Sequence, residues 1–121
     1  MIAVIFEVWP AEGKQDTYLA LAARMKTHLE GFDGFISVER FESLTEPGKL
    51  LSVSFWRDEA ALANWRRLEE HRVMQKRGRA DLFAGYRLRI GSVLRDYTHD
   101  NREEAPADSK AVHDVALPAA E

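Results

Sequence analysis

The sequence contains no cysteine and no long apolar run. The lack of cysteine excludes disulfides, metal sites built on thiolates and a cysteine nucleophile. No stretch of the 121 residues approaches the roughly 20 apolar residues that a membrane-spanning helix needs. The first seven residues lack the basic segment of a secretory signal and are typical of a β-strand. We therefore expect a cytoplasmic protein that does not bind membranes.

Neither sign of charge dominates. The chain has 17 Lys and Arg residues against 20 Asp and Glu residues, a formal net charge of −3. Six of the acidic residues fall in 98–121, and the first 97 residues carry 15 basic and 14 acidic side chains. This near-neutral composition argues against nucleic-acid binding. We expect a folded domain over residues 1–97 and an acidic tail over 98–121, whose Pro, Ala, Asp and Glu content is typical of disorder.

Known metal and cofactor motifs are also missing. No glycine-rich nucleotide loop, nucleophile elbow or zinc-binding helix motif occurs. The four histidines, His28, His71, His99 and His113, do not pair at the three- or four-residue spacing that places two ligands on one helix face. We expect neither a metal nor a cofactor.

Apolar periodicity predicts six elements in the first 97 residues. Alternation predicts strands over 2–9, 35–42, 50–56 and from 86 to about 97, and the turn at 45–48 makes the middle two a hairpin. Helical spacing predicts helices over 13–30 and from Asp58, a plausible N-cap, to Arg77 with a break near Arg66. This β-α-β-β-α-β order is typical of the ferredoxin-like α+β plan, a four-stranded antiparallel sheet with two helices on one face.

The second face of such a sheet has no helix to cover it. Alternation predicts aromatic and polar side chains together on this face: Trp9, Phe35, Phe41 and Trp56 with Glu7, Ser37, Glu39, Ser52, Ser54 and Arg89. A patch of this size normally marks an interface or a ligand site. We therefore expect a homodimer whose sheets pack face to face around a lined cavity.

The densest cluster of polar side chains falls on the second helix. Asn64, His71 and Gln75 share one helical face, where His71 could transfer a proton and Gln75 could orient a ligand. The alternative is a partly buried histidine that hydrogen-bonds the sheet backbone or Tyr86.

Aromatic and basic residues provide two further hypotheses. Three tryptophans could stack on a flat aromatic ligand or serve as packing alone: Trp9, Trp56 and Trp65. Three arginines could bind an anionic substrate or stabilise an enolate: Arg79, Arg87 and Arg89. The alternative for the arginines is a set of salt bridges across the sheet to Glu7 or Glu39.

Several of these segments together resemble the antibiotic biosynthesis monooxygenase family. They are Phe55 to Trp65, Glu70-His71, Gln75 to Arg79, Tyr86 to Ile90 and Arg95 to Tyr97. The resemblance covers about residues 1–97 and implies the dimeric α/β-barrel fold. It also implies oxygenation without metal or flavin, in which the enzyme deprotonates a phenol or quinol, the anion donates an electron to O₂, and a peroxide collapses to a quinone.

The resemblance implies that Trp65 lines the substrate pocket. From their positions we expect His71 to transfer the proton and Arg89 to stabilise the anion. The other expected substrate contacts are Trp56, Gln75, Asn64, Tyr86 and Glu7.

Two alternatives remain at this point. Relatives that degrade heme combine an Asn on the first strand with a helical Trp and a His ten residues later. Here Trp65 fits, but Gln75 stands at the histidine position and the first strand has no Asn. The second alternative is a dimer that binds a small molecule without turnover, because this fold hosts unrelated chemistries.

Overall fold

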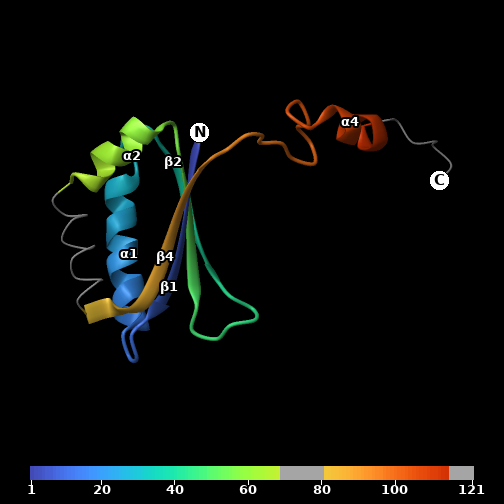
Figure 1. The fold of residues 1–121 in the computed structure, drawn as a ribbon. Helices are drawn as coiled ribbons and strands as arrows, with labels where there is room; N and C mark the ends of the chain where they lie inside the picture. The colour runs from blue at the N-terminus through green and yellow to red at the C-terminus, as the bar shows by residue number, and fades with distance from the viewer. Residues whose placement is uncertain (69–80, 115–121) are drawn as a thin grey trace.

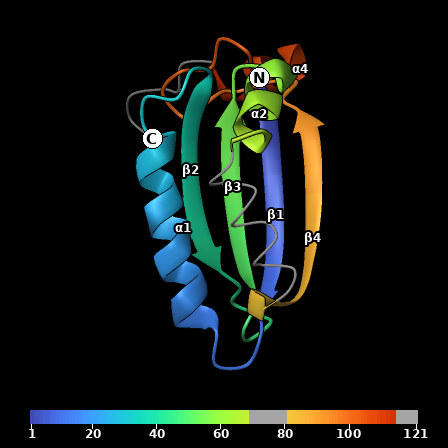
Figure 2. The same ribbon diagram turned by 90° about the vertical axis from the view of Figure 1, so that its left-hand side faces the viewer.

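The computed structural model describes residues 1–68 and 81–114. Its elements, in chain order, are β1 (Ile2–Pro10), α1 (Gln15–Leu29), β2 (Phe35–Glu42), β3 (Leu50–Trp56), α2 (Glu59–Arg66), β4 (Phe83–Ser92) and α4 (Ala107–His113). The four strands form one antiparallel sheet in the order β2-β3-β1-β4, and α1 and α2 lie on the same side of it (Figures 1 and 2). The predicted ferredoxin-like α+β fold is confirmed.

The last strand and the second helix differ from their predicted bounds. β4 begins at Phe83, which pairs with Pro10 of β1 beyond a bulge, rather than at residue 86. It ends at Ser92, where the pairing with β1 reaches Ile2, rather than near residue 97. Helix α2 ends at Arg66, at the predicted break. Its predicted continuation over residues 69–77 lies outside the described part of the chain.

The core fills the space between α1, α2 and the sheet. Helix α1 contributes Tyr18, Ala22, Met25 and Leu29, which recur at three- and four-residue steps and form one buried stripe. Near the end of β1 this stripe meets Val8 and Leu50, and toward α2 it meets Trp56 and Trp65. Burial of this stripe therefore docks α1 on the sheet.

The helix-side face of the sheet carries the even-numbered residues of β1 and β3. Ser54 pairs with Val4 and Val38, and Ser52 pairs with Phe6, which places these side chains on one face. Our prediction that Ser52, Ser54, Trp56 and Phe35 lie on the uncovered face is wrong. Trp56 is 2% exposed and packs in the core, and Phe35 packs against it. The error arises because Leu51, Val53 and Phe55 are more apolar than the serines, although they occupy the uncovered face.

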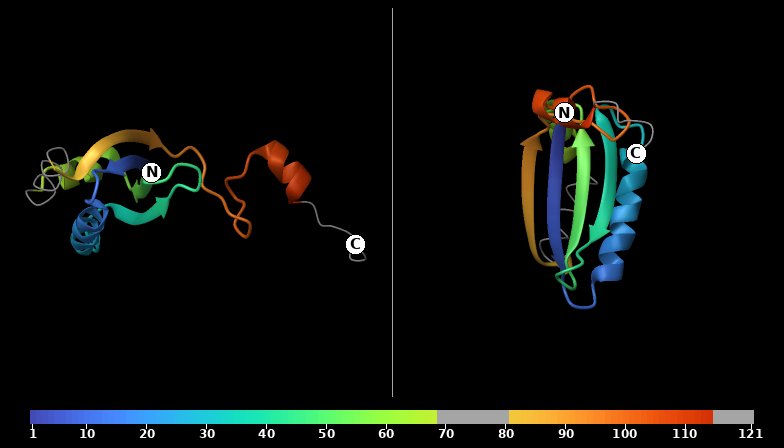
Figure 3. Two further views of the ribbon diagram at one scale, coloured as in Figure 1. Left: turned by 90° about the horizontal axis from the view of Figure 1, so that it is seen from below. Right: turned by 90° about the vertical axis from the view of Figure 1, so that its right-hand side faces the viewer.

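The uncovered face of the sheet carries the odd-numbered residues of β1 and their neighbours. Ile5 pairs with Val53 and Arg89, and Glu7 pairs with Leu51 and Arg87. Figure 3 (right) shows the sheet from this side, where none of the described helices lies over the middle of the strands.

The first turn of helix α2 packs against the loop that follows α1. The Asp58 side chain accepts a hydrogen bond from the Ala61 N–H at 2.8 Å, which confirms the predicted N-cap. The Gly34 carbonyl accepts from the Arg57 N–H at 2.7 Å. Gly34 has φ +86°, and a Cβ there would overlap the Ala61 side chain. The absence of a side chain at Gly34 therefore lets α2 pack this close to the loop.

The segment after Ser92 leaves the sheet on the side opposite the helices and ends in α4 (Figures 1 and 3). Its composition predicts disorder, whereas Ala107–His113 form a helix. Arg102 contacts Asp114, donates to Ser109 Oγ at 2.9 Å and lies 5.2 Å from the centre of the Tyr97 ring. These contacts explain how a polar segment without a core of its own folds back on itself. Within the described part of the chain, every helix is too short or too polar to cross a bilayer.

We predict that Gly34→Ala lowers the free energy of unfolding by about 3 kcal/mol, the sum of roughly 1–2 kcal/mol for the left-handed backbone and about 1–2 kcal/mol for overpacking. Gly48→Ala is the matched control, since Gly48 has φ +81° but open space around the position of a Cβ. Gly48→Ala should lower the free energy of unfolding only by the roughly 1–2 kcal/mol for the left-handed backbone. Urea unfolding of both variants measures the difference, and equal losses would contradict the packing argument.

Candidate functional site

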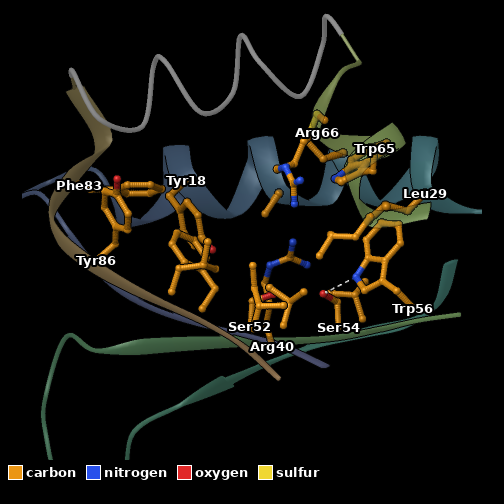
Figure 4. A pocket seen from close by; sticks show the side chains of 18 residues that line it. Tyr18, Leu29, Arg40, Ser52, Ser54, Trp56, Trp65, Arg66, Phe83 and Tyr86 are labelled. Atoms are coloured by element: carbon orange, nitrogen blue, oxygen red, sulfur yellow. Dashed lines mark hydrogen bonds between the residues drawn. The ribbon is translucent and has the colours of Figure 1, made fainter. Parts of the chain in front are cut away.

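A cavity of about 300 Å³ lies between α1, α2 and the helix-side face of the sheet (Figure 4). This volume is at the lower end of the range for small-molecule sites. Most of the lining side chains are apolar, and Leu88 and Ile90 of β4 are nearly half exposed at its edge. The cavity therefore suits a small, largely apolar organic molecule.

Aromatic side chains stand at both ends of the cavity. Trp56 and Trp65 lie at one end with ring centres 6.3 Å apart, and Phe83 and Tyr86 lie at the other with ring centres 5.9 Å apart (Figure 4). Three residues that we predicted as substrate contacts, Trp56, Trp65 and Tyr86, thus line one cavity. Flat walls of this kind favour a ring-containing ligand.

Hydroxyl groups border the middle of the cavity. Ser54 Oγ accepts a hydrogen bond from Trp56 Nε1 at 3.0 Å, which leaves the serine hydrogen free to donate elsewhere. Tyr18 is 2% exposed. Burial raises the pKa of Tyr18 above its ordinary value, although the nearby Arg40 guanidinium opposes this. The Tyr18 phenol is therefore protonated at neutral pH and can serve as a donor.

Arg40 is a cavity residue that the sequence analysis missed. It lies on β2 two residues after Val38 and lines the cavity with it. Its Nε is buried and has no hydrogen-bond partner among the described residues. The signal in the sequence was the two-residue spacing, because side chains two residues apart on a regular strand lie on the same face. An arginine two residues from a core valine therefore faces the core.

Glu7 and Arg89, two predicted site residues, lie on the uncovered face rather than in the cavity. Glu7 Oε1 is 3.2 Å from Lys49 Nζ, and Arg89 Nη1 donates to Glu7 Oε2 at 3.3 Å. The hydrogen bond from Lys49 lowers the pKa of Glu7, and the charges of Lys49, Arg89 and Arg87 add to it. The structure thus shows the salt-bridge alternative that the sequence analysis left open for Arg89.

Asn64, another predicted substrate contact, is not among the residues that line the cavity. Asn64 is exposed, and its Oδ1 accepts from Arg67 at 3.3 Å. His71 and Gln75 lie outside the described residues, and their predicted roles stay predictions. In residues 1–68 and 81–114, no group of three or more His, Asp or Glu side chains is arranged to hold a metal ion.

Comparison with known proteins identifies the family. The sequence model of the antibiotic biosynthesis monooxygenase family matches residues 1–77. The chain belongs to this family. It is 45% identical over 93 residues to a jasmonate monooxygenase of Pyricularia oryzae, an alignment that covers 77% of this chain and 43% of the relative. The alignment therefore spans less than half the length of that relative.

A second relative and two solved structures are also similar to this chain. The uncharacterised protein YqjZ of Bacillus subtilis is 31% identical over 94 residues, covering 77% of this chain and 79% of YqjZ. The structure of Rv0793 from Mycobacterium tuberculosis has a TM-score of 0.72 at 22% identity, covering 80% and 98% of the two chains. SnoaB, a cofactor-independent oxygenase from Streptomyces nogalater, has a TM-score of 0.68 at 10% identity, covering 78% and 94%. At such low identities the two structures establish the fold alone.

We predict that Glu7→Gln destabilises the protein at pH 7 and that this difference disappears in acid. A lowered pKa means that folding favours the ionised carboxylate of Glu7. Its contribution to stability is therefore complete above pH 4.5, the ordinary pKa of a glutamate, and is lost as the pH falls through the lower pKa of the folded state. Urea unfolding at pH 7, 5 and 3.5 measures it, with the exposed Glu12→Gln as control. A Glu7→Gln difference that stays constant with pH would contradict the salt-bridge assignment.

Proposed function

We propose that this chain is a monooxygenase that oxidises a small, electron-rich phenol or quinol with O₂, without a metal or a flavin. The observation that carries the proposal is the apolar cavity with Trp56 and Trp65 on its wall, in a chain of the antibiotic biosynthesis monooxygenase family. The relative named as a jasmonate monooxygenase and the structural neighbour named as a cofactor-independent oxygenase support it.

The proposed reaction takes all of its electrons from the substrate. Removal of the phenol proton gives an anion that transfers one electron to O₂, and the substrate radical and superoxide combine at a ring carbon. The resulting peroxide loses water, so one oxygen atom becomes a quinone carbonyl and the other leaves as H₂O. The protein has to hold a flat ring, exclude bulk water and accommodate negative charge.

The described residues fit the first two of these tasks. The aromatic groups at both ends of the cavity can hold a ring, and the apolar lining disfavours water. Removal of the proton is the role that we propose for His71. Arg89 pairs with Glu7 on the uncovered face, so the group that accommodates the negative charge has to come from the cavity itself.

The uncovered face of the sheet supports a homodimer as the functional unit. Ile5 and Phe41 are 37% and 45% exposed on this face, and they pair with Val53 and Leu51. An apolar surface across the middle of a sheet normally marks an interface. A second copy of the same face covers it and closes the two sheets into the dimeric barrel that the family resemblance implies.

Oxygen uptake by the metal-stripped protein tests the proposed activity. We predict saturable uptake above the spontaneous rate with at least one substrate in a panel of reduced naphthoquinols and anthrols, and jasmonate is included because of the relative's name. Trp65→Phe should lower kcat/KM at least tenfold, because the cavity wall loses one of its two indole rings. Trp9→Phe, the same change on the uncovered face, should leave kcat/KM within twofold of the native value. Uptake at the spontaneous rate with every compound, or equal effects of the two variants, would count against the proposal.

Light scattering tests the dimer. We predict a mass of twice the chain's 13.8 kDa at micromolar concentration. Val53→Lys should give a monomer, because it places a charge in the centre of the proposed interface. Leu44→Lys, at a fully exposed turn position, should remain dimeric. A native protein that is monomeric at this concentration is the result that would exclude the dimer.

A further inference from the structure

We infer that the cavity binds its substrate through an anionic oxygen held by Arg40, so that the ligands are organic acids or phenolates rather than neutral molecules. The inference deepens the proposed function and rests on it for the assignment of the cavity as the substrate site. It makes Arg40 the residue that selects for charge.

The position of Arg40 leaves its charge inside the cavity. Arg40 pairs with Ser52 on β3, and Ser52 pairs with Phe6 on β1, so the arginine projects from the middle of the helix-side face. Its Nε is buried without a hydrogen-bond partner among the described residues. A buried donor on a charged group is costly unless something accepts from it. Because the cavity adjoins this donor, a bound ligand can supply the acceptor.

The groups around Arg40 add to its preference for an anion. Tyr18 is a protonated donor, Ser54 has a free hydroxyl hydrogen, and Arg66 reaches the cavity from the end of α2 (Figure 4). None of the described residues that line the cavity is an acid. Glu42, two residues beyond Arg40 on β2, is exposed and outside the lining. The described part of the cavity therefore has positive charge and hydrogen-bond donors without a carboxylate to neutralise them.

The apolar ends of the cavity indicate what the rest of the ligand is. Arg40 lies between the two aromatic ends, with Trp56 and Trp65 on one side and Phe83 and Tyr86 on the other (Figure 4). A ring can stack at one end while its acidic oxygen reaches the guanidinium in the middle. A carboxylate and a phenolate offer the same anionic oxygen, and a phenolate is also the ionised form of the substrate in the proposed reaction.

Calorimetric binding to matched probes tests the inference without turnover. The carboxylate probe is 2-naphthoate, and its neutral match is methyl 2-naphthoate, which has the same ring system. We expect 2-naphthoate to bind at least tenfold more tightly than the ester. Arg40→Gln should remove this preference, and Arg40→Lys, which keeps the charge but not the two-pronged geometry, should retain part of it.

The phenolate arm uses 4-nitrophenol, which turns yellow when it ionises. At a pH below its own pKa, binding to the native protein should produce the yellow anion, and binding to Arg40→Gln should not. A preference in either arm supports the anion site, and the arm that responds identifies the source of the oxygen.

Two controls separate binding from folding and from general charge effects. Lys26→Gln removes a positive charge from the exposed side of α1 and should leave binding within twofold of the native value. Arg40→Gln should unfold at the same or a higher urea concentration than the native protein, because it removes a charge that no carboxylate among the described lining residues pairs with.

An ester that binds as tightly as the acid, together with colourless binding of 4-nitrophenol, would overturn the inference. Acid binding that Arg40→Gln does not weaken would overturn it as well. Failure of the proposed function looks different, because then the acid binds through Arg40 but no compound in the oxygen-uptake panel is consumed.

Discussion

The cavity depends on small residues in the middle of the helix-side face of the sheet. Ser52 and Ser54 stand on β3 where a packed core normally has large apolar side chains, and the strand pairing places them beside Phe6 and Val4. Close-packed interiors leave few voids larger than a water molecule, so two serines at this level leave space that the neighbours do not fill. Arg40 on β2 pairs with Ser52 and projects from the same face into that space. The site therefore follows from the register of three strands.

The contact between Trp56 and Trp65 both forms part of the cavity wall and stabilises the fold. Trp56 comes from β3 and Trp65 from α2, and Phe32 meets both rings edge-on with centres 6.3 and 5.4 Å away. This cluster docks α2 on the sheet, and it is also the wall at one end of the cavity. Substitutions in the wall thus alter both the packing of the fold and the shape of the cavity, so conservative variants and matched controls are needed there.

The sequence was sufficient to predict the order of the elements, the hairpin, the N-cap at Asp58 and the family. It was not sufficient to orient β3, because Leu51, Val53 and Phe55 have the alternation of a core face while the serines on the other face border a cavity. Hydropathy alone does not separate the two faces, because apolar side chains occupy both of them. The pairing of Glu7 with Arg89 depends on the register between β1 and β4, which composition does not specify. Arg40 was overlooked for the same reason. Alternation along β2 places Arg40 on the same face as Val38, but the sequence does not show which face of the strand the helices cover.

The central claim is that one cavity holds the ring of the substrate against the tryptophans and its anionic oxygen against Arg40. A crystal structure with 2-naphthoate bound tests this most directly. The account predicts the naphthalene ring between the helices and the sheet, with a carboxylate oxygen within 2.7–3.2 Å of the Arg40 guanidinium, the range of ordinary hydrogen bonds. A ligand bound on the uncovered face, or bound in the cavity with its carboxylate turned away from Arg40, would contradict it.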